Sequence, residues 1–381
     1  MQHLQSAQGQ SLSFVSSQFG TLGVEVEVQL VDWRTLQPSP AASRLLARLG
    51  GESPQLKAEL FQSMLELTTG ICRNLDEVET DLRQAARRLA AVADLEGVEV
   101  MSAGTHPLAA MDAHVLFPKT RYVEVLERTQ WITRRCSVFG LHIHVGARNG
   151  DHAVAMINDL APYMAALLAL SASSPFLEGH DTGLASSRIT AYEAHPASGT
   201  PPSYRSWSEF EQLSDKLFRA GAITSLKDLW WDIRPSPLYG TIELRMCDSQ
   251  STLTETLSLV ALVQCLMAWL EAVREHPRPA STWRLRENKW RAARYGLEAE
   301  LIVNEQGETR PVREIWWELL EELEPIALKL GCLRHLQPIR RTLEQGASYH
   351  RQRQVHQRSG SLQSVVQELI GEWRADLAAA P

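Results

Sequence analysis

Cysteine is scarce in this chain, with five residues among 381 and no Cys-x-x-Cys spacing. This scarcity excludes a disulfide-stapled scaffold and a structural zinc site built from thiolates. It is typical of a reducing compartment, so we expect a cytoplasmic protein. The cysteines are Cys72, Cys136, Cys247, Cys265 and Cys332.

Positive charge and long apolar runs are also lacking. The 38 Lys and Arg residues are outnumbered by 45 Asp and Glu residues, and this net charge of −7 argues against nucleic acid as the main partner. The most apolar segments, 153–172 and 256–273, are interrupted by polar residues and predict buried helices, not membrane spans. Residues 1–18 are Gln- and Ser-rich without the apolar core of a secretory leader, and we expect them to be disordered.

Paired carboxylates are what the chain does have. Residues 23–30 read Gly-Val-Glu-Val-Glu-Val-Gln-Leu. Side chains alternate along a strand, so Glu25 and Glu27 share one face and the valines share the other. Neighbouring carboxylates repel each other, and either water or a cation must compensate. For this segment alone, a solvated edge strand remains the alternative.

Imidazoles occupy the polar face of a second strand-like segment, residues 139–146. His142 and His144 alternate there with Leu, Ile and Val. Neutral imidazole is a common metal ligand, although a His-x-His pair alone is a weak signal. His144 is equally consistent with a ligand and with a residue that orients a ligand.

A third segment, residues 239–247, places Glu243 and Arg245 on one face. This pair fits either a simple ion pair or a metal ligand beside an arginine that clamps phosphate. Cys247 has the same parity, so we expect it on the Glu243 face, as a small buried filler rather than a nucleophile.

Two further acids, Glu59 and Glu66, lie in residues 57–69. They are an odd number of residues apart and would face opposite ways on one regular strand. A bend or a bulge must therefore intervene if both serve one site.

Together these segments predict an α+β fold. We expect one catalytic domain over residues 19–381, becoming helical from about residue 282. Its mainly antiparallel, curved sheet would pack its outer, apolar face on helices and line a cavity with its polar face. Acid-rich oxygen ligands suit Mg²⁺ or Mn²⁺, and a metal beside arginine suits phosphoryl transfer from a nucleotide.

Several short motifs occur in a characteristic order along nearly the whole chain. By them the chain resembles the YbdK-like carboxylate–amine ligases, a branch of the glutamate–cysteine ligase (type 2) family with a glutamine-synthetase-like sheet. The motifs are Thr-Leu-Gly-Val-Glu-Val-Glu at 21–27, Ser-Met-Leu-Glu-Leu at 63–67, Gly-Thr-His-Pro at 104–107, Val-Phe-Gly-Leu-His-Ile-His-Val-Gly at 138–146, Leu-Ser-Ala-Ser-Ser-Pro at 170–175, Ala-Ser-Ser-Arg at 185–188, Trp-Asp-Ile-Arg-Pro-Ser-Pro at 231–237, Gly-Thr-Ile-Glu-Leu-Arg at 240–245 and Arg-Tyr-Gly-Leu-Glu at 294–298.

The resemblance implies ATP-dependent joining of a carboxylic acid to an amine, with glutamate and cysteine as its suggested substrates. ATP would phosphorylate the acid to an acyl phosphate, which the amine attacks. It implies a Mg²⁺ or Mn²⁺ cofactor and no membrane or nucleic-acid partner. The oligomeric state is not predicted, and a homodimer is one option. The implied metal ligands are Glu25, Glu27, Glu59, Glu66, His142 and Glu243.

The same resemblance implies roles for four arginines. Arg245 would contact the transferred phosphate, and Arg294 would contribute to the nucleotide site. Arg188 and Arg234 would bind a substrate carboxylate or a phosphate, with a plain salt bridge as the equal alternative. One departure weakens the metal set, because Gln62 stands where relatives have an acid, and Glu59 supplies one nearby.

Three rival functions remain open at this point. A guanidino-kinase-like phosphotransferase would leave a stable phosphorylated product and need no amine. A non-catalytic binding protein could retain the fold. A metal-dependent hydrolase could use the same carboxylates without ATP.

Overall fold

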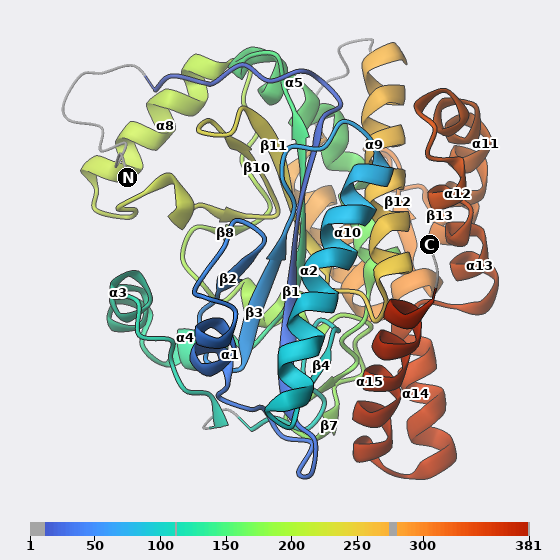
Figure 1. Ribbon diagram of the computed structural model, residues 1–381. Helices are drawn as coiled ribbons and strands as arrows, with labels where there is room; N and C mark the ends of the chain where they lie inside the picture. Colours follow the sequence, from blue (N-terminus) through green and yellow to red (C-terminus); the bar gives the residue numbers. More distant parts are fainter. Residues whose placement is uncertain (1–11, 111–112, 274–279, 380–381) are drawn as a thin grey trace.

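A seven-stranded sheet, antiparallel in every pairing, forms the centre of the protein. The computed structural model describes residues 12–110, 113–273 and 280–379 (Figure 1). The strands follow the order β10-β11-β5-β1-β3-β2, and β4 extends β1. They are β1 Leu22–Asp32, β2 Leu56–Ala58, β3 Met64–Thr68, β4 Val98–Met101, β5 Gly140–Gly146, β10 Ile233–Ser236 and β11 Thr241–Asp248.

Helices cover the apolar face of this sheet, as predicted. In Figure 1, α2, α9 and α15 stand on one side of the strands, with α11 to α14 beyond them. Val24, Val26 and Val28 of β1 are fully buried against this layer. The covering helices are α2 Leu75–Leu95, α5 Gly150–Leu160, α6 Met164–Ser171, α9 Leu253–Val273, α10 Thr282–Tyr295, α11 Val312–Leu330, α12 Leu333–Leu336, α13 Pro338–Gln345, α14 Ser348–Ser359 and α15 Leu362–Ala378.

The two most apolar segments pack as core helices. The first runs from α5 through a 3₁₀ turn at Ala161–Tyr163 into α6, and Pro162 lies in that turn. The most apolar windows of these two segments are 78% and 72% buried inside the protein. Both segments are long and apolar enough to span a membrane, but most of their apolar surface is covered by the rest of the protein.

The remaining elements lie partly beside the polar face of the sheet and partly against the covering helices. Figure 1 shows α3, α8, β2 and β8 on the side of the strands opposite α9 and α15. These elements are α1 Ala42–Arg48, α3 Thr120–Thr129, α4 Trp131–Arg134, α7 Ser187–Tyr192, α8 Trp207–Arg219, η3 Leu226–Asp228, β6 Phe176–Leu177, β7 His180–Asp181, β8 Ser198–Gly199 and β9 Trp230–Trp231.

A bulge in β11 changes which residues face the site. Leu244 pairs with Ile143, but Cys247 pairs with Leu141, so one extra residue lies between the two pairs. The alternation therefore shifts after Arg245. Cys247 joins the apolar core, and Asp248 turns to the polar side. The prediction that Cys247 shares the Glu243 face was wrong, although its role as a buried filler agrees with the structure.

Two other segments differ from the sequence-based expectations. Residues 12–18 are not detached from the fold, because the amide of Val15 donates to Pro237 O at 2.9 Å and that of Ser17 to Ala147 O at 3.0 Å. Residues 1–11 lie outside the described part of the chain. The region beyond residue 282 contains a hairpin of β12 (Glu300–Ile302) and β13 (Thr309–Pro311) between its helices.

Candidate active site

Three rows of functional side chains cross the polar face of the sheet. Cross-strand partners on one face lie about 5 Å apart, so the register itself brings them together. The rows are Arg234, Glu243, His144 and Gly23; then His142, Glu25 and Thr68; then Glu27, Glu66 and Lys57.

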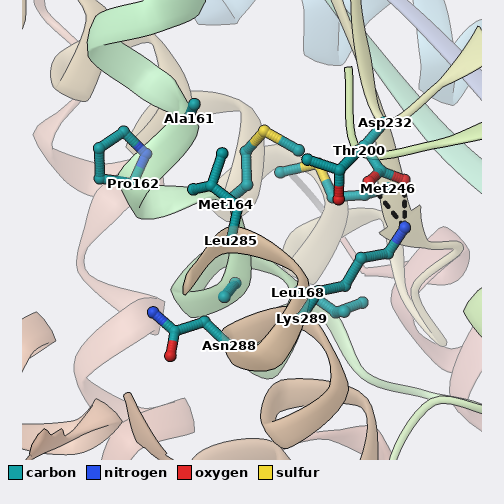
Figure 2. Close-up of a pocket in the computed structure, with 11 residues that line it drawn as sticks. Ala161, Pro162, Met164, Leu168, Thr200, Asp232, Met246, Leu285, Asn288 and Lys289 are labelled. Atoms are coloured by element: carbon teal, nitrogen blue, oxygen red, sulfur yellow. Dashed lines mark hydrogen bonds and ion pairs between the residues drawn. The ribbon is translucent and has the colours of Figure 1, made fainter. Parts of the chain in front are cut away.

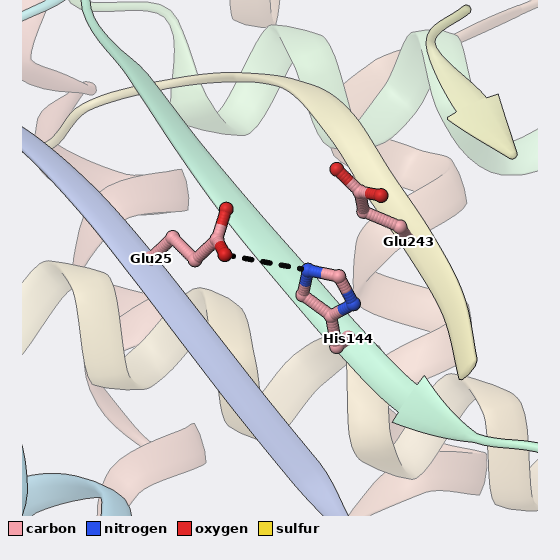
Figure 3. Close-up of side chains that lie close together, drawn as sticks. All are labelled: Glu25, His144 and Glu243. Carbon is pink, nitrogen blue, oxygen red and sulfur yellow. Dashed lines mark ion pairs between the residues drawn. The ribbon is translucent and has the colours of Figure 1, made fainter. Parts of the chain in front are cut away.

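Glu25 lies at the centre of these rows and contacts both histidines. His142 Nδ1 is 3.2 Å from Glu25 Oε2. His144 Nε2 is 3.9 Å from Glu25 Oε1, as Figure 3 shows. Burial alone would raise the pKa of Glu25, but the hydrogen bond from His142 and the nearby His144 lower it to about 2. Glu25 is therefore a permanent anion at the centre of the site.

His142 is held in a form that can bind a cation. Burial, followed by the nearby Arg245, lowers its pKa to about 4, so the ring is neutral at pH 7. A neutral ring that donates from Nδ1 to Glu25 leaves the Nε2 lone pair available. His144 is anchored from its own Nδ1, which lies 2.8 Å from Thr241 Oγ1. Its Nε2 consequently faces Glu25 and Glu243.

Glu27, Glu59 and Glu66 crowd the other half of the site. Burial and the charge of Glu59 raise the pKa of Glu27 to about 7. Burial and Glu25 raise the pKa of Glu59, and burial with Glu25 and Glu59 raises that of Glu66 well above its usual value. The Lys57 ammonium, 3.3 Å from Glu66, only partly offsets this repulsion. A bound divalent cation would offset the repulsion in such a cluster.

Glu59 and Glu66 can face the same site because they do not lie on the same strand. Glu59 directly follows β2, whereas Glu66 lies on the paired strand β3. The two acids therefore do not share one strand, and the turn between β2 and β3 lets both approach Glu25. A bulge within a single strand, as considered from the sequence, is not needed.

Glu243 is fully engaged by two arginines. Arg234 binds it through two contacts, Nε to Oε2 at 2.8 Å and Nη2 to Oε1 at 3.0 Å. Arg245 Nη1 donates to the same Oε1 and its Nε lies 3.3 Å from the Tyr192 hydroxyl. Burial would raise the pKa of Glu243, but Arg234 and then Arg245 hold it well below its usual range.

The donor set fits divalent cations at two neighbouring positions. Glu25, His144 and Glu243 form one group, and Glu25, Glu66 and His142 form the other. Within each group the candidate ligand atoms lie within 4.8 Å of one another. Carboxylate oxygens with one imidazole suit Mg²⁺ or Mn²⁺. Glu27 and Glu59 stand beside these groups and add negative charge.

The glutamate–cysteine ligase family 2 model matches residues 21–368 of the chain. The chain belongs to this family. It is 45% identical over 374 residues to a protein of Thermobifida fusca (strain YX) provisionally named glutamate–cysteine ligase 2, covering 96% of this chain and 94% of that one. A protein of Bdellovibrio bacteriovorus (strain ATCC 15356 / DSM 50701 / NCIMB 9529 / HD100) with the same provisional name is 42% identical over 371 residues, covering 97% and 98%.

Solved structures agree on the fold of this ligase. It superposes with a TM-score of 0.70 on a glutamate–cysteine ligase from Francisella tularensis in complex with AMP, at 12% identity over 96% of this chain and 91% of that chain. A bifunctional glutathione synthetase from Pasteurella multocida gives 0.64 at 16% identity, over 94% and 51%. The predicted family and fold class are confirmed, and the chain is an ATP-dependent ligase of the carboxylate–amine type.

Arg188 of the ligase lies beneath the carboxylates, on α7. It is 1% exposed, and its guanidinium donates to Arg245 O at 3.1 Å and to Met246 O at 3.2 Å. Its charge opposes the rise in the pKa of Glu27. These contacts favour a supporting role over direct contact with a substrate carboxylate, which was one of its predicted roles.

Asp248 is the site residue that sequence reasoning missed. Its Oδ2 accepts from the amide of Ser173 at 2.9 Å and the hydroxyl of Ser174 at 2.7 Å, and its Oδ1 accepts from the hydroxyl of Ser186 at 2.9 Å. The Ser174 hydroxyl oxygen in turn accepts from the amide of Arg188 at 3.1 Å. Asp248 thus joins two of the sequence motifs, 170–175 and 185–188, and helps to set the position of Arg188. Only the bulge in β11 turns it inward, so strand alternation could not reveal it.

Arg294, predicted to contribute to the nucleotide site, lies apart from the carboxylates. Arg294 Nη1 donates to Gly183 O, and its guanidinium stacks 5.0 Å from the Tyr295 ring. These are contacts within the helical side of the protein and do not reach the acids. His106 stabilises the turn that contains it, because its Nδ1 accepts from the amides of Leu108 and Ala109.

A small crevice behind the sheet contains a buried ion pair that supports Arg245. Figure 2 shows Lys289 directed at Asp232 among apolar neighbours. Lys289 Nζ lies 2.7 and 2.6 Å from the two carboxylate oxygens of Asp232 and 2.6 Å from Glu193 Oε1. The carbonyl of Asp232 accepts from the amide of Arg245 at 2.7 Å. The ion pair therefore holds Asp232 in place, and the carbonyl of Asp232 binds the part of β11 that carries this arginine.

Proposed function

We propose that this ligase joins a carboxylic acid to an amine through an acyl phosphate, with glutamate as the acid and cysteine as the amine. The observation that carries the proposal is the meeting of crowded carboxylates with buried arginines on one sheet face. The names of the relatives suggest the two substrates. The reaction would take place in one domain spanning residues 19–381, in the cytoplasm.

The residues divide into a cation-binding half and an anion-binding half. Glu25, Glu66, His142, His144 and Glu243 would hold Mg²⁺, with Glu27 and Glu59 lowering the local potential. The metal would supply charge neutralisation at the transferred phosphoryl group.

Arg234 and Arg245 are the groups placed to bind the phosphate. Each guanidinium has a planar fork of N–H donors, and each donates hydrogen bonds to the Glu243 carboxylate. If Glu243 turns toward a metal, these donors become available to a phosphate oxygen. Arg188 and Asp248 hold this arrangement from below, and Arg294 remains a candidate for the nucleotide site.

A hydroxamate assay tests the proposal. Purified protein, ATP and Mg²⁺ are mixed with a panel of carboxylic acids and hydroxylamine, and ADP is followed in parallel. We expect ADP and hydroxamate to appear together with glutamate, and neither to appear in Glu25→Gln. The matched control is Glu368→Gln, an exposed acid on α15.

The rivals give different results in the same assay. A phosphotransferase would release ADP with a stable phosphorylated product and no hydroxamate. A hydrolase would cleave its substrate without ATP. A binding protein would release no ADP with any acid, and the proposal would then be rejected.

A further inference from the structure

The described chain begins with a segment that crosses one end of the sheet. This N-terminal strap, residues 12–18, passes the end of β5 and the turn between β10 and β11. The amide of Val15 donates to Pro237 O at 2.9 Å, and the hydroxyl of Ser17 donates to Tyr239 O at 3.0 Å. The strap is therefore hydrogen-bonded to the turn at two points.

The strap is itself anchored at both of its ends. Near its start, Trp207 Nε1 of α8 donates to Leu12 O at 3.1 Å, and the rings of Phe14 and Trp207 meet edge-on with centroids 5.3 Å apart. Near its end, the amide of Ser17 donates to Ala147 O at 3.0 Å, just beyond β5. These contacts give the turn a fixed support.

Gly240 lets the turn pass close against the strap. Its φ is +65°, in the left-handed region that favours glycine. A Cβ at this position would overlap Val15 O and crowd the Ser17 hydroxyl. A side chain here would therefore force the strap and the turn apart.

The residues on either side of Gly240 both contact His144. Thr241 Oγ1 lies 2.8 Å from His144 Nδ1, and the Tyr239 ring meets the imidazole edge-on with centroids 6.0 Å apart. A histidine that binds a cation through Nε2 carries its proton on Nδ1, and the partner of Nδ1 fixes this tautomer. The Thr241 hydroxyl oxygen can accept from Nδ1–H, which leaves the Nε2 lone pair on the side that faces Glu25.

We propose that the N-terminal strap positions His144 for cation binding, acting through Gly240 and Thr241. These are positioning residues, because they act through the imidazole of His144. That His144 binds a cation rests on the proposed function. That the strap and Thr241 set the tautomer and direction of the ring rests only on the contacts described above.

Three variants break this link at different points. Gly240→Ala separates the turn from the strap, Ser17→Ala removes one hydrogen bond of the strap to the turn, and Thr241→Val removes the hydroxyl but keeps the shape of the side chain. Thr241→Ser keeps the hydroxyl. Gly307→Ala is the matched control for Gly240→Ala, because Gly307 joins β12 to β13 with a φ of +85° and has open space where its Cβ would lie.

Two readouts are compared across these variants. The first is the tautomer of His144 in the metal-free protein, measured by NMR on ligase labelled with ¹⁵N-histidine, with His144→Gln to assign the signal. The second is the Kd for Mn²⁺, measured by calorimetric titration. Urea unfolding in EDTA shows which variants remain folded, and Ser17→Ala tests the strap if Gly240→Ala does not fold.

We expect the proton on Nδ1 of His144 in wild type, Thr241→Ser and Gly307→Ala. Gly240→Ala and Thr241→Val should lose this preference and bind Mn²⁺ about 10- to 100-fold more weakly, which is the usual effect of removing the partner of a metal-binding histidine. Ser17→Ala should change both readouts in the same direction by a smaller factor.

The proposal is overturned if wild type binds no Mn²⁺, if Thr241→Val matches wild type in either readout, or if Gly240→Ala matches Gly307→Ala. Failure of the proposed function is a different result. A tautomer and a Kd that depend on Gly240 and Thr241 would uphold the strap even if no hydroxamate formed. Hydroxamate formation by wild type, with both readouts unchanged in the variants, would uphold the function and reject the strap.

Discussion

Glu27→Gln should stabilise the metal-free ligase at alkaline pH. Glu27 has a pKa of about 7 in the folded protein against a usual value of 4.5. Between these values the folded state binds more protons than the unfolded state, so stability falls as pH rises. The cost is below about 1 kcal/mol at pH 5 and reaches at most about 3 kcal/mol at pH 8. The amide oxygen of the substituted side chain can still accept from the amide of Gly140, as Glu27 does, so the geometry is retained.

Urea unfolding in EDTA at pH 5 and pH 8 measures this effect. We expect Glu27→Gln to exceed wild type by up to about 3 kcal/mol at pH 8 and by much less at pH 5. Glu368→Gln, which removes an exposed acid, should match wild type at both values.

Mg²⁺ should remove most of this difference at pH 8. A ligand at 100 times its Kd stabilises the folded state by about 2.7 kcal/mol, and wild type should show such a gain. Glu27→Gln should lose most of it, because the negative charge of the cluster has dropped. The reasoning is refuted if the variant is less stable than wild type in EDTA at pH 8, or if both gain equally from Mg²⁺.

Three further predictions concern the frame around the site. Asp248→Ala removes three hydrogen bonds and should lower the free energy of unfolding by about 3 kcal/mol, measured with urea. Cys247→Ala should keep wild-type kcat, measured in the hydroxamate assay, because this thiol faces the core. Glu243→Gln leaves two buried arginines unpaired and should destabilise the fold by about 3–5 kcal/mol, seen as a lower urea midpoint, besides abolishing turnover.

Alternation alone predicted most of the sheet and its carboxylates. Glu25, Glu27 and the two histidines were placed correctly because buried valines, leucines and isoleucines alternate with them in β1 and β5. Side chains alternate between the two faces of a strand. When the apolar face packs on helices, the polar side chains therefore gather on the other face.

Features that depend on tertiary contacts could not be predicted in this way. The bulge after Leu244 reverses the facing of Cys247 and Asp248, and nothing in the local pattern marks it. The burial of Arg188 likewise follows from the packing of α7 against β11.

Oxygen-isotope transfer tests the central claim most directly. The ligase is supplied with ATP, Mg²⁺, the amine and an acid whose carboxylate carries ¹⁸O, and the phosphorus products are analysed by mass spectrometry. An acyl phosphate intermediate predicts one ¹⁸O in each inorganic phosphate released and none in the nucleotide. Label in AMP, or unlabelled phosphate during full amide formation, would contradict the account.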